Sequence, residues 1–117
     1  NGKKIIYYLG VSKLKDQLYV MNANGSNKLN ISKDSLQNFY PSWVSKNKIV
    51  YTQRRNEINH IFSSSPNGNH NKQLLKAESF YTRISPNGKM IAYIDQKEHC
   101  IKVVSLSEEL IVRISLI

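Results

Sequence analysis

The chain has 117 residues, enough for one domain of ordinary size, and 40% of them are hydrophobic, enough for a packed core. Seventeen Lys and Arg against eight Asp and Glu give a net charge of +9, and the single cysteine excludes an internal disulfide or a Cys-based zinc site. No apolar run approaches the roughly 18 residues of a membrane-spanning helix. The start at Asn1 has no charged segment before an apolar stretch, so no signal peptide is expected here.

Short segments rich in Ile, Val, Tyr and Phe follow one another along the chain, each bounded by polar turn residues. In chain order they are Lys4–Leu9, Gln17–Met21, Lys48–Thr52, His60–Phe62, Lys89–Ile94, Ile101–Leu106 and Leu110–Ile114. Such segments are typical of strands, and no stretch keeps a 3.6-residue apolar period over three turns. Four of the five glycines follow Asn, which favours type I′ hairpin turns with positive φ at both central residues. The sequence therefore predicts an all-β meander.

The strands and turns recur along the chain. Three alignments show the repeat: residues 18–25 with 61–68, residues 48–51 with 90–93, and residues 39–43 with 80–84. The period is about 42 residues with four strands in each unit, which is the spacing of a β-propeller blade.

The segment Phe80–Tyr93 resembles the repeat of TolB-like β-propellers, in which a Trp-Ser-Pro-Asp-Gly-Lys turn leads into an Ile-Ala-Phe/Tyr strand. Residues 18–25 are similar to the IYVMDADG strand and turn of that repeat, and Pro41-Ser42-Trp43 to another of its hallmarks. The middle unit has Val44–Asn47 where Ser-Pro-Asp-Gly is expected and is one residue short, so its first hairpin is expected to differ. The resemblance implies four-stranded antiparallel blades, with units of about 1–37, 38–78 and 79–117.

The predicted units do not complete a propeller. Numbered from the innermost strand A to the outermost strand D, the first unit has strands B to D and the other two have A to D, eleven in all. Closed propellers have about four to eight blades. Two alternatives follow. The chain is either a partial propeller, meaning a piece of a longer one, or half of an oligomeric ring in which two copies give six blades. The missing strand A would come from the partner or from the tail Ser115–Ile117.

Aromatic residues divide into two predicted groups. Five recur on strands B and C and are expected to pack between blades: Tyr7, Tyr19, Tyr51, Phe62 and Tyr93. Four candidate binding residues lie on or beside strand A, which lines the channel of a propeller: Tyr40, Trp43, Tyr81 and Arg83. Aromatic residues with an arginine in a concave setting are typical anchors of a protein-binding surface. Trp43 aligns with Ile84, so it is also expected to pack in the core.

No residues in the sequence form a recognisable catalytic or metal-binding pattern. His60, His70 and His99 lack metal-ligand spacing, and no pair of carboxylates is placed as a general acid and base. The nearest string to a Gly-x-Ser-x-Gly elbow, residues 10–14, lacks the second glycine. No catalytic residue, metal or cofactor is therefore expected, and the chain is not expected to be an enzyme.

By resemblance, the chain is expected to be a non-catalytic scaffold or protein-interaction module in the periplasm or outside the cell. TolB-like propellers bind lipoprotein partners of the bacterial envelope at the channel mouth. Self-association would complete the ring. The alternative is a ligand-binding or enzymatic propeller acting on acidic saccharides, which the positive charge would suit. A nucleic-acid site is not favoured, because the basic residues are scattered in runs no longer than Lys3-Lys4 or Arg54-Arg55.

Overall fold

The computed structural model describes residues 3–12, 15–32, 34–75, 79–106 and 110–115, which contain strands and no helix. The eleven strands in these residues are β1 (Lys4–Ser12), β2 (Lys15–Asn22), β3 (Leu29–Asn30), β4 (Gln37–Ser45), β5 (Lys48–Arg55), β6 (Ile58–Ser64), β7 (Lys72–Leu75), β8 (Ser79–Ile84), β9 (Met90–Asp95), β10 (Cys100–Ser105) and β11 (Leu110–Ser115). The all-β prediction is confirmed. No helix in the described residues is long and apolar enough to cross a membrane.

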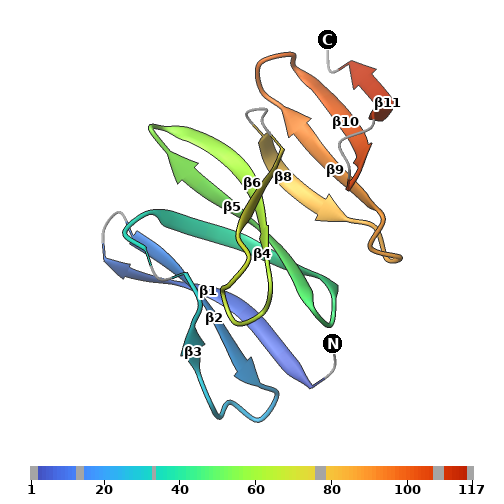
Figure 1. Cartoon of the computed structure of the whole chain (residues 1–117). Helices are drawn as coiled ribbons and strands as arrows, with labels where there is room; N and C mark the ends of the chain where they lie inside the picture. Colours follow the sequence, from blue (N-terminus) through green and yellow to red (C-terminus); the bar gives the residue numbers. More distant parts are fainter. Residues whose placement is uncertain (1–2, 13–14, 33, 76–78, 107–109, 116–117) are drawn as a thin grey trace.

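The strands form three antiparallel sheets, each a meander in which every strand pairs with the next one along the chain. Sheet 1 has the order β1-β2-β3, sheet 2 has β4-β5-β6-β7, and sheet 3 has β8-β9-β10-β11. The sheets follow one another as layers from the N-terminal to the C-terminal end of the chain (Figure 1). Strand β4 of sheet 2 contacts β1 and β2 on one side and β8 on the other. The architecture is thus a series of blade-like sheets.

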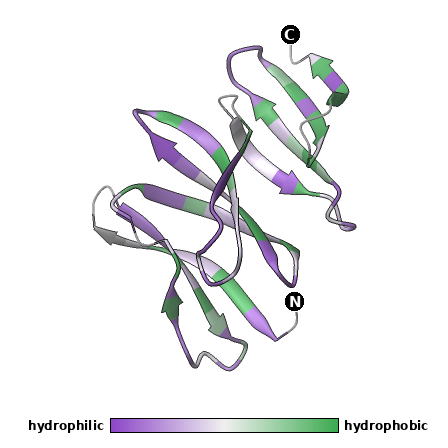
Figure 2. Cartoon of the chain, in the orientation of Figure 1, coloured by the Kyte–Doolittle hydropathy of each residue, from purple (hydrophilic) through white to green (hydrophobic). Residues whose placement is uncertain are grey.

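Two apolar clusters hold the three sheets together. One joins sheets 1 and 2 and consists of Leu18, Val20, Ile31, Ile49, Tyr51 and Phe62, with Ile6 and Trp43 packed against it. The other joins sheets 2 and 3 and consists of Val50, Ile61, Leu74, Leu75, Ile91, Tyr93 and Val104, with Val44, Ile84 and Leu106 packed against it. Successive residues of a strand point to opposite faces, so Ile49 enters one cluster and Val50 the other. Sheet 2 therefore presents apolar side chains on both faces, and Figure 2 shows hydrophobic residues as green bands along its strands.

The aromatic residues predicted to pack between blades fall into two groups. Tyr51 and Phe62 stack with 6.1 Å between ring centroids in the first cluster, and Tyr93 is buried in the second. Tyr7 and Tyr19 also stack, at 5.5 Å, but on the other face of sheet 1 from the cluster. No described sheet covers that face, so their packing between blades stays a prediction.

The Asn-Gly turns differ from the type I′ prediction, which is wrong for the three that the structure describes; Asn1-Gly2 lies outside the described residues. Positive φ occurs at Gly25, Gly68 and Gly88 but at none of the asparagines before them. Each glycine amide donates to the carbonyl three residues earlier, and each Asn Oδ1 accepts from the amide two residues later. This is a type I turn whose fourth residue is in the left-handed region, closed by an Asx hydrogen bond.

The middle hairpin differs from its equivalent in sheet 3, as the sequence predicts. Ser45 pairs with Lys48 across two residues in sheet 2, whereas β8 ends at Ile84 and β9 begins at Met90. The type I′ geometry occurs instead at Asn56-Glu57, where both residues have positive φ and no glycine is present.

Candidate protein-binding site

In the described residues, sheet 1 has one strand fewer than its neighbours, and the missing position is the edge of β1 away from β2, where the innermost strand of a blade would lie. Within the described residues, β1 pairs only with β2, while β5 and β9 each pair with a strand on both sides. The predicted supply of a fourth strand by the tail is wrong for Ser115, which pairs with Cys100 in sheet 3. The rest of that tail lies outside the described residues.

Along most of its length, the edge of β1 carries none of the devices by which proteins commonly block pairing with another chain; the exceptions are Lys4 at its start and a register shift between Gly10 and Ser12 at its end. From Lys4 to Gly10 it pairs with β2 in continuous register, without a bulge or a proline. By contrast, β4 contains Pro41 and a bulge, and β8 contains Arg83 and a bulge. From Ile5 to Gly10, strand β1 is therefore an uncharged template for pairing in continuous register.

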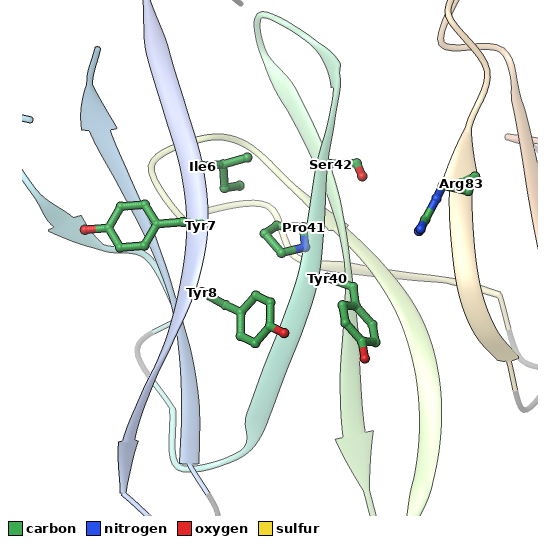
Figure 3. Close-up of a pocket in the computed structure, with 7 residues that line it drawn as sticks. All are labelled: Ile6, Tyr7, Tyr8, Tyr40, Pro41, Ser42 and Arg83. Atoms are coloured by element: carbon green, nitrogen blue, oxygen red, sulfur yellow. The ribbon is translucent and has the colours of Figure 1, made fainter. Parts of the chain in front are cut away.

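An open pocket of about 380 Å³ lies beside this edge. Its lining comes from β1 (Ile6, Tyr7 and Tyr8), from β4 (Tyr40, Pro41 and Ser42) and from β8 (Arg83). Figure 3 shows Ile6 and Tyr8 on the pocket side of β1 and the Tyr7 ring on the other side, as strand alternation requires. Three strands that lie far apart in the sequence thus line one pocket.

The walls of the pocket are aromatic. The rings of Tyr8 and Tyr40 meet edge to face, with centroids 5.8 Å apart, and Tyr40 packs on Phe39 in the same way at 4.8 Å. Both tyrosines remain more than 40% exposed, so their rings are open to a ligand. Edge-to-face contacts fix ring orientation, which prepares an aromatic wall before anything binds.

Arg83 supplies the positive charge of the pocket. Its side chain is exposed and points from β8 toward β4, where Tyr40 and Ser42 lie (Figure 3), and one guanidinium nitrogen donates to the Thr82 carbonyl at 3.0 Å. The remaining donors of the guanidinium fork could take a carboxylate or a peptide carbonyl.

Two of the three strands that line the pocket, β4 and β8, each contain a tyrosine with a strained backbone. Tyr40 in β4 and Tyr81 in β8 have φ values of 50° and 52°, in the left-handed region that disfavours bulky residues. Both sit in a bulge, because the register shifts between Phe39 and Ser42 and between Phe80 and Arg83. The same strained residue thus occurs at the same place in two units, a feature often associated with functional sites.

The four candidate residues predicted from the sequence separate in space. Tyr40 and Arg83 come together in the pocket. Tyr81 is 60% exposed on β8 and does not line it. Trp43 packs against the first apolar cluster and lines a second pocket, at the end of sheets 1 and 2. The sequence analysis missed Tyr8, although its place in the first unit beside an absent strand A could have indicated it.

No protein-family model matches this chain, and no curated protein matches it either.

A partly buried polar network lies at the end of sheet 2 where β5 meets β6. The carboxylate of Asp34 accepts hydrogen bonds from the side-chain amides of Asn38 and Gln53, at 2.8 and 3.2 Å. Gln53 also accepts from the Arg55 guanidinium, which lies 5.0 Å from the centre of the Phe62 ring. Burial, with the nearby Asp34 charge, raises the pKa of Tyr51 to about 12, so this phenol stays neutral. These groups satisfy one another and hold the start of β4, a structural role.

Sheet 3 has a charged group at the corresponding end. Asp95 is buried and forms an ion pair with Lys102 at 3.0 Å, and Lys102 also pairs with Glu98. Burial alone would raise the pKa of Asp95, but hydrogen bonds from the Glu98 amide and from Lys102 outweigh it and lower the pKa. The bond to Glu98, with the contribution of Asp95, raises the pKa of Lys102. Within the described residues, no three His, Cys, Asp or Glu side chains are grouped to hold a metal ion.

Proposed function

We propose that this chain is a non-catalytic protein-interaction module that accepts an extended strand of a partner at the edge of β1. The observation that carries the proposal is that, in the part of the chain that the structure describes, β1 pairs on one edge only, in a three-stranded sheet beside two four-stranded ones. An extended peptide that adds to a sheet edge gains affinity from main-chain hydrogen bonds, and pockets for its side chains provide specificity.

The pocket supports this proposal because it lies where the side chains of an added strand would point. In sheet 3, β8 pairs with β9 through Arg83 opposite Ala92 and Ile84 opposite Ile91. By the repeat, a strand added to β1 would face Ile6 and Ile5 in the same way. Its alternate side chains would then enter the pocket of Tyr8, Tyr40 and Arg83. A TolB-like propeller of the bacterial envelope, with a lipoprotein as partner, is the setting that the sequence resemblance suggests.

The test uses a synthetic peptide with the sequence of residues 37–45, which forms the innermost strand of sheet 2. We expect it to bind the whole chain and to slow hydrogen exchange at β1 amides, while a scrambled peptide of the same composition does neither. A Tyr8→Ala, Arg83→Ala double variant should weaken binding by about tenfold. The matched control is Arg113→Ala, which removes an exposed arginine on β11. Protection at β11 instead of β1, or no binding of the peptide, would contradict the proposal.

We further propose that copies of the chain associate head to tail through the outer faces of sheets 1 and 3. The outer face of sheet 1 carries Ile5 and Tyr7, the repeat equivalents of Ile49 and Tyr51, which pack between sheets 1 and 2. The outer face of sheet 3 is also apolar and includes Ala92, Ile94, Ile101, Val103, Val112 and Ile114. The equivalent face of sheet 2 packs against Ile91 and Tyr93 of sheet 3.

The surface area of the chain supports association. The accessible surface is 7260 Å², whereas a monomeric protein of this mass exposes about 6500 Å². Ile5, Val112 and Ile114 are 39%, 42% and 51% exposed on the two outer faces. Exposed apolar faces of this kind are typical of protein interfaces.

A further inference from the structure

Half of the described basic residues, although scattered along the sequence, lie at one end of the sheets. In a meander, alternate turns lie at the same end. One end holds the start of β1 and the β2–β3, β4–β5, β6–β7 and β8–β9 turns (Figure 1). In the described part of the chain, seven lysines lie at this end and form what we name the lysine rim: Lys3, Lys4, Lys28, Lys46, Lys48, Lys72 and Lys89.

The acidic residues lie at the other end. Those that the structure describes are Asp16, Asp34, Glu57, Asp95 and Glu98, all at or beside the β1–β2, β5–β6 and β9–β10 turns or the loop into β4. None of these five described acidic residues belongs to the end that carries the lysine rim. Seven lysines gathered at one end produce a positive local field, which favours a polyanionic ligand.

A pocket of about 390 Å³ opens within the rim, between the ends of sheets 1 and 2. Its apolar floor consists of Val20, Leu29 and Trp43. Its polar lining consists of Lys4, Lys46, Asn27, Asn47 and Asn67. The Lys4 ammonium is already oriented, since it donates to the Asn22 side chain at 2.7 Å. An indole with ammonium and amide groups around it presents a flat apolar face, positive charge, and both donors and acceptors.

We infer that the lysine rim and its pocket bind an acidic polysaccharide. A sugar ring with a carboxylate combines an apolar ring face, several hydroxyls and a negative charge. The ring face can stack on the Trp43 indole, the hydroxyls can form hydrogen bonds with the asparagine amides, and the carboxylate can pair with the lysines. Arginine, whose planar fork matches phosphate, is absent from the rim in the residues that the structure describes. Single-stranded nucleic acid would also need several aromatic platforms, and the pocket has only Trp43.

The chain's single tryptophan is in the pocket, so its fluorescence reports binding at this site. We expect oligomers of glucuronic acid to change Trp43 fluorescence in a saturable way at low salt, with affinity that falls as salt is added. A neutral glucose oligomer of the same length should give no change. Tighter binding of oligothymidylate than of oligoglucuronate would overturn the inference in favour of a nucleic acid, and no response to either would overturn it as well.

Two double variants that lower the net charge equally distinguish binding at the pocket from a general attraction between the positively charged chain and the negatively charged oligomer. Lys4→Gln with Lys46→Gln removes two ammonium groups of the pocket and should weaken oligoglucuronate binding by about tenfold. Lys15→Gln with Lys97→Gln removes two lysines at the opposite end and should leave affinity within about twofold. Equal losses in both variants would show that only the total charge matters, and would overturn the assignment to the rim.

Discussion

Three glycines share one turn geometry but differ in the surroundings of their α-carbons. A β-carbon at Gly68 would meet the Ile31 carbonyl of sheet 1, and one at Gly88 would lie 2.6 Å from the Val44 carbonyl of sheet 2. At Gly25 nothing lies within 4 Å. The turns of sheets 2 and 3 therefore pack directly on the preceding sheet, and the absence of a side chain sets the distance between sheets.

This difference predicts unequal costs for the same substitution. Gly25→Ala should destabilise by about 1 kcal/mol, because φ at that residue is +87° and only backbone strain is added. Gly68→Ala has the same φ and an added clash with backbone, so about 2–4 kcal/mol is expected. Urea unfolding of the two variants and the unchanged chain measures both values. Equal losses would show that the turn of residues 65–68 does not press on sheet 1.

The buried Asp95 carboxylate makes stability depend on pH in the acid range. Because its pKa is lower in the folded chain than the unfolded value of about 3.9, its contribution is full above that value. The contribution is lost as pH falls through the folded pKa. The free energy of unfolding should therefore fall more steeply below about pH 4 for the unchanged chain than for Asp95→Asn. Urea midpoints between pH 6 and pH 2 test this, and identical acid slopes would contradict it.

At the scale of elements, the innermost strands β4 and β8 share a bulge with a tyrosine in the left-handed region. In an ordinary strand, alanine is more stable than glycine by about 0.5–1 kcal/mol. At Tyr81 the order should reverse, with Tyr81→Gly more stable than Tyr81→Ala by about 1 kcal/mol, because only glycine adopts this φ freely.

The control for this reversal is Val112, an exposed residue of β11 whose φ is not positive. There, Val112→Ala should be more stable than Val112→Gly. Thermal unfolding of the four variants gives both differences. If alanine is the more stable residue at both positions, the left-handed conformation of Tyr81 is not strained, and the argument that links this bulge to a functional site fails.

The strands could be predicted because their pattern is local. Short runs of β-branched and aromatic residues between turn residues predict seven of the eleven strands, and the repeat of about 42 residues predicts the other four and groups all of them into blade-like units. The turn geometry could not be predicted from Asn-Gly alone, since a type I turn ending in a left-handed glycine uses the same dipeptide. The deciding contacts of Gly68 and Gly88 lie on other sheets, so they are tertiary.

The candidate site was only half predictable for a related reason. The repeat places Tyr40 and Arg83 on equivalent inner strands, but only the packing of β4 between β1 and β8 brings them beside Tyr8. The lysine rim follows from alternation of turns along a meander, a rule that can be applied to a sequence once the strands are assigned. Read along the chain, the same lysines show no cluster.

At the scale of the whole molecule, the proposed sites occupy separate parts of the surface. The open edge of β1 lies beside the pocket that β4 and β8 also line. The lysine rim lies at one end of the strands, around the second pocket. The apolar outer faces of sheets 1 and 3 are the first and last faces in the series of sheets. Association through the outer faces would therefore leave both the β1 edge and the rim accessible. A ring of copies would repeat each site, which raises avidity for a partner with several binding segments.

The outer faces predict how association responds to substitution. Ile114→Lys on sheet 3 and Ile5→Lys on sheet 1 each place a charge where an apolar contact is expected, at side chains exposed enough for the chain to fold. Each variant alone should be monomeric by light scattering after size exclusion, while the unchanged chain has twice the monomer mass. Ile58→Lys, at the end of the β5–β6 hairpin and equally open to solvent, is the control and should keep the dimer.

A mixture of the two variants distinguishes a head-to-tail contact from a contact between identical faces. The Ile5→Lys chain keeps an intact sheet 3 face, and the Ile114→Lys chain keeps an intact sheet 1 face. In a head-to-tail arrangement these two faces pair, so mixing should restore a dimer joined by one interface, weaker than the closed ring of two. Contacts between identical faces would give a dimer in one of the variants alone. A monomeric unchanged chain across a tenfold concentration range would contradict the self-association proposal.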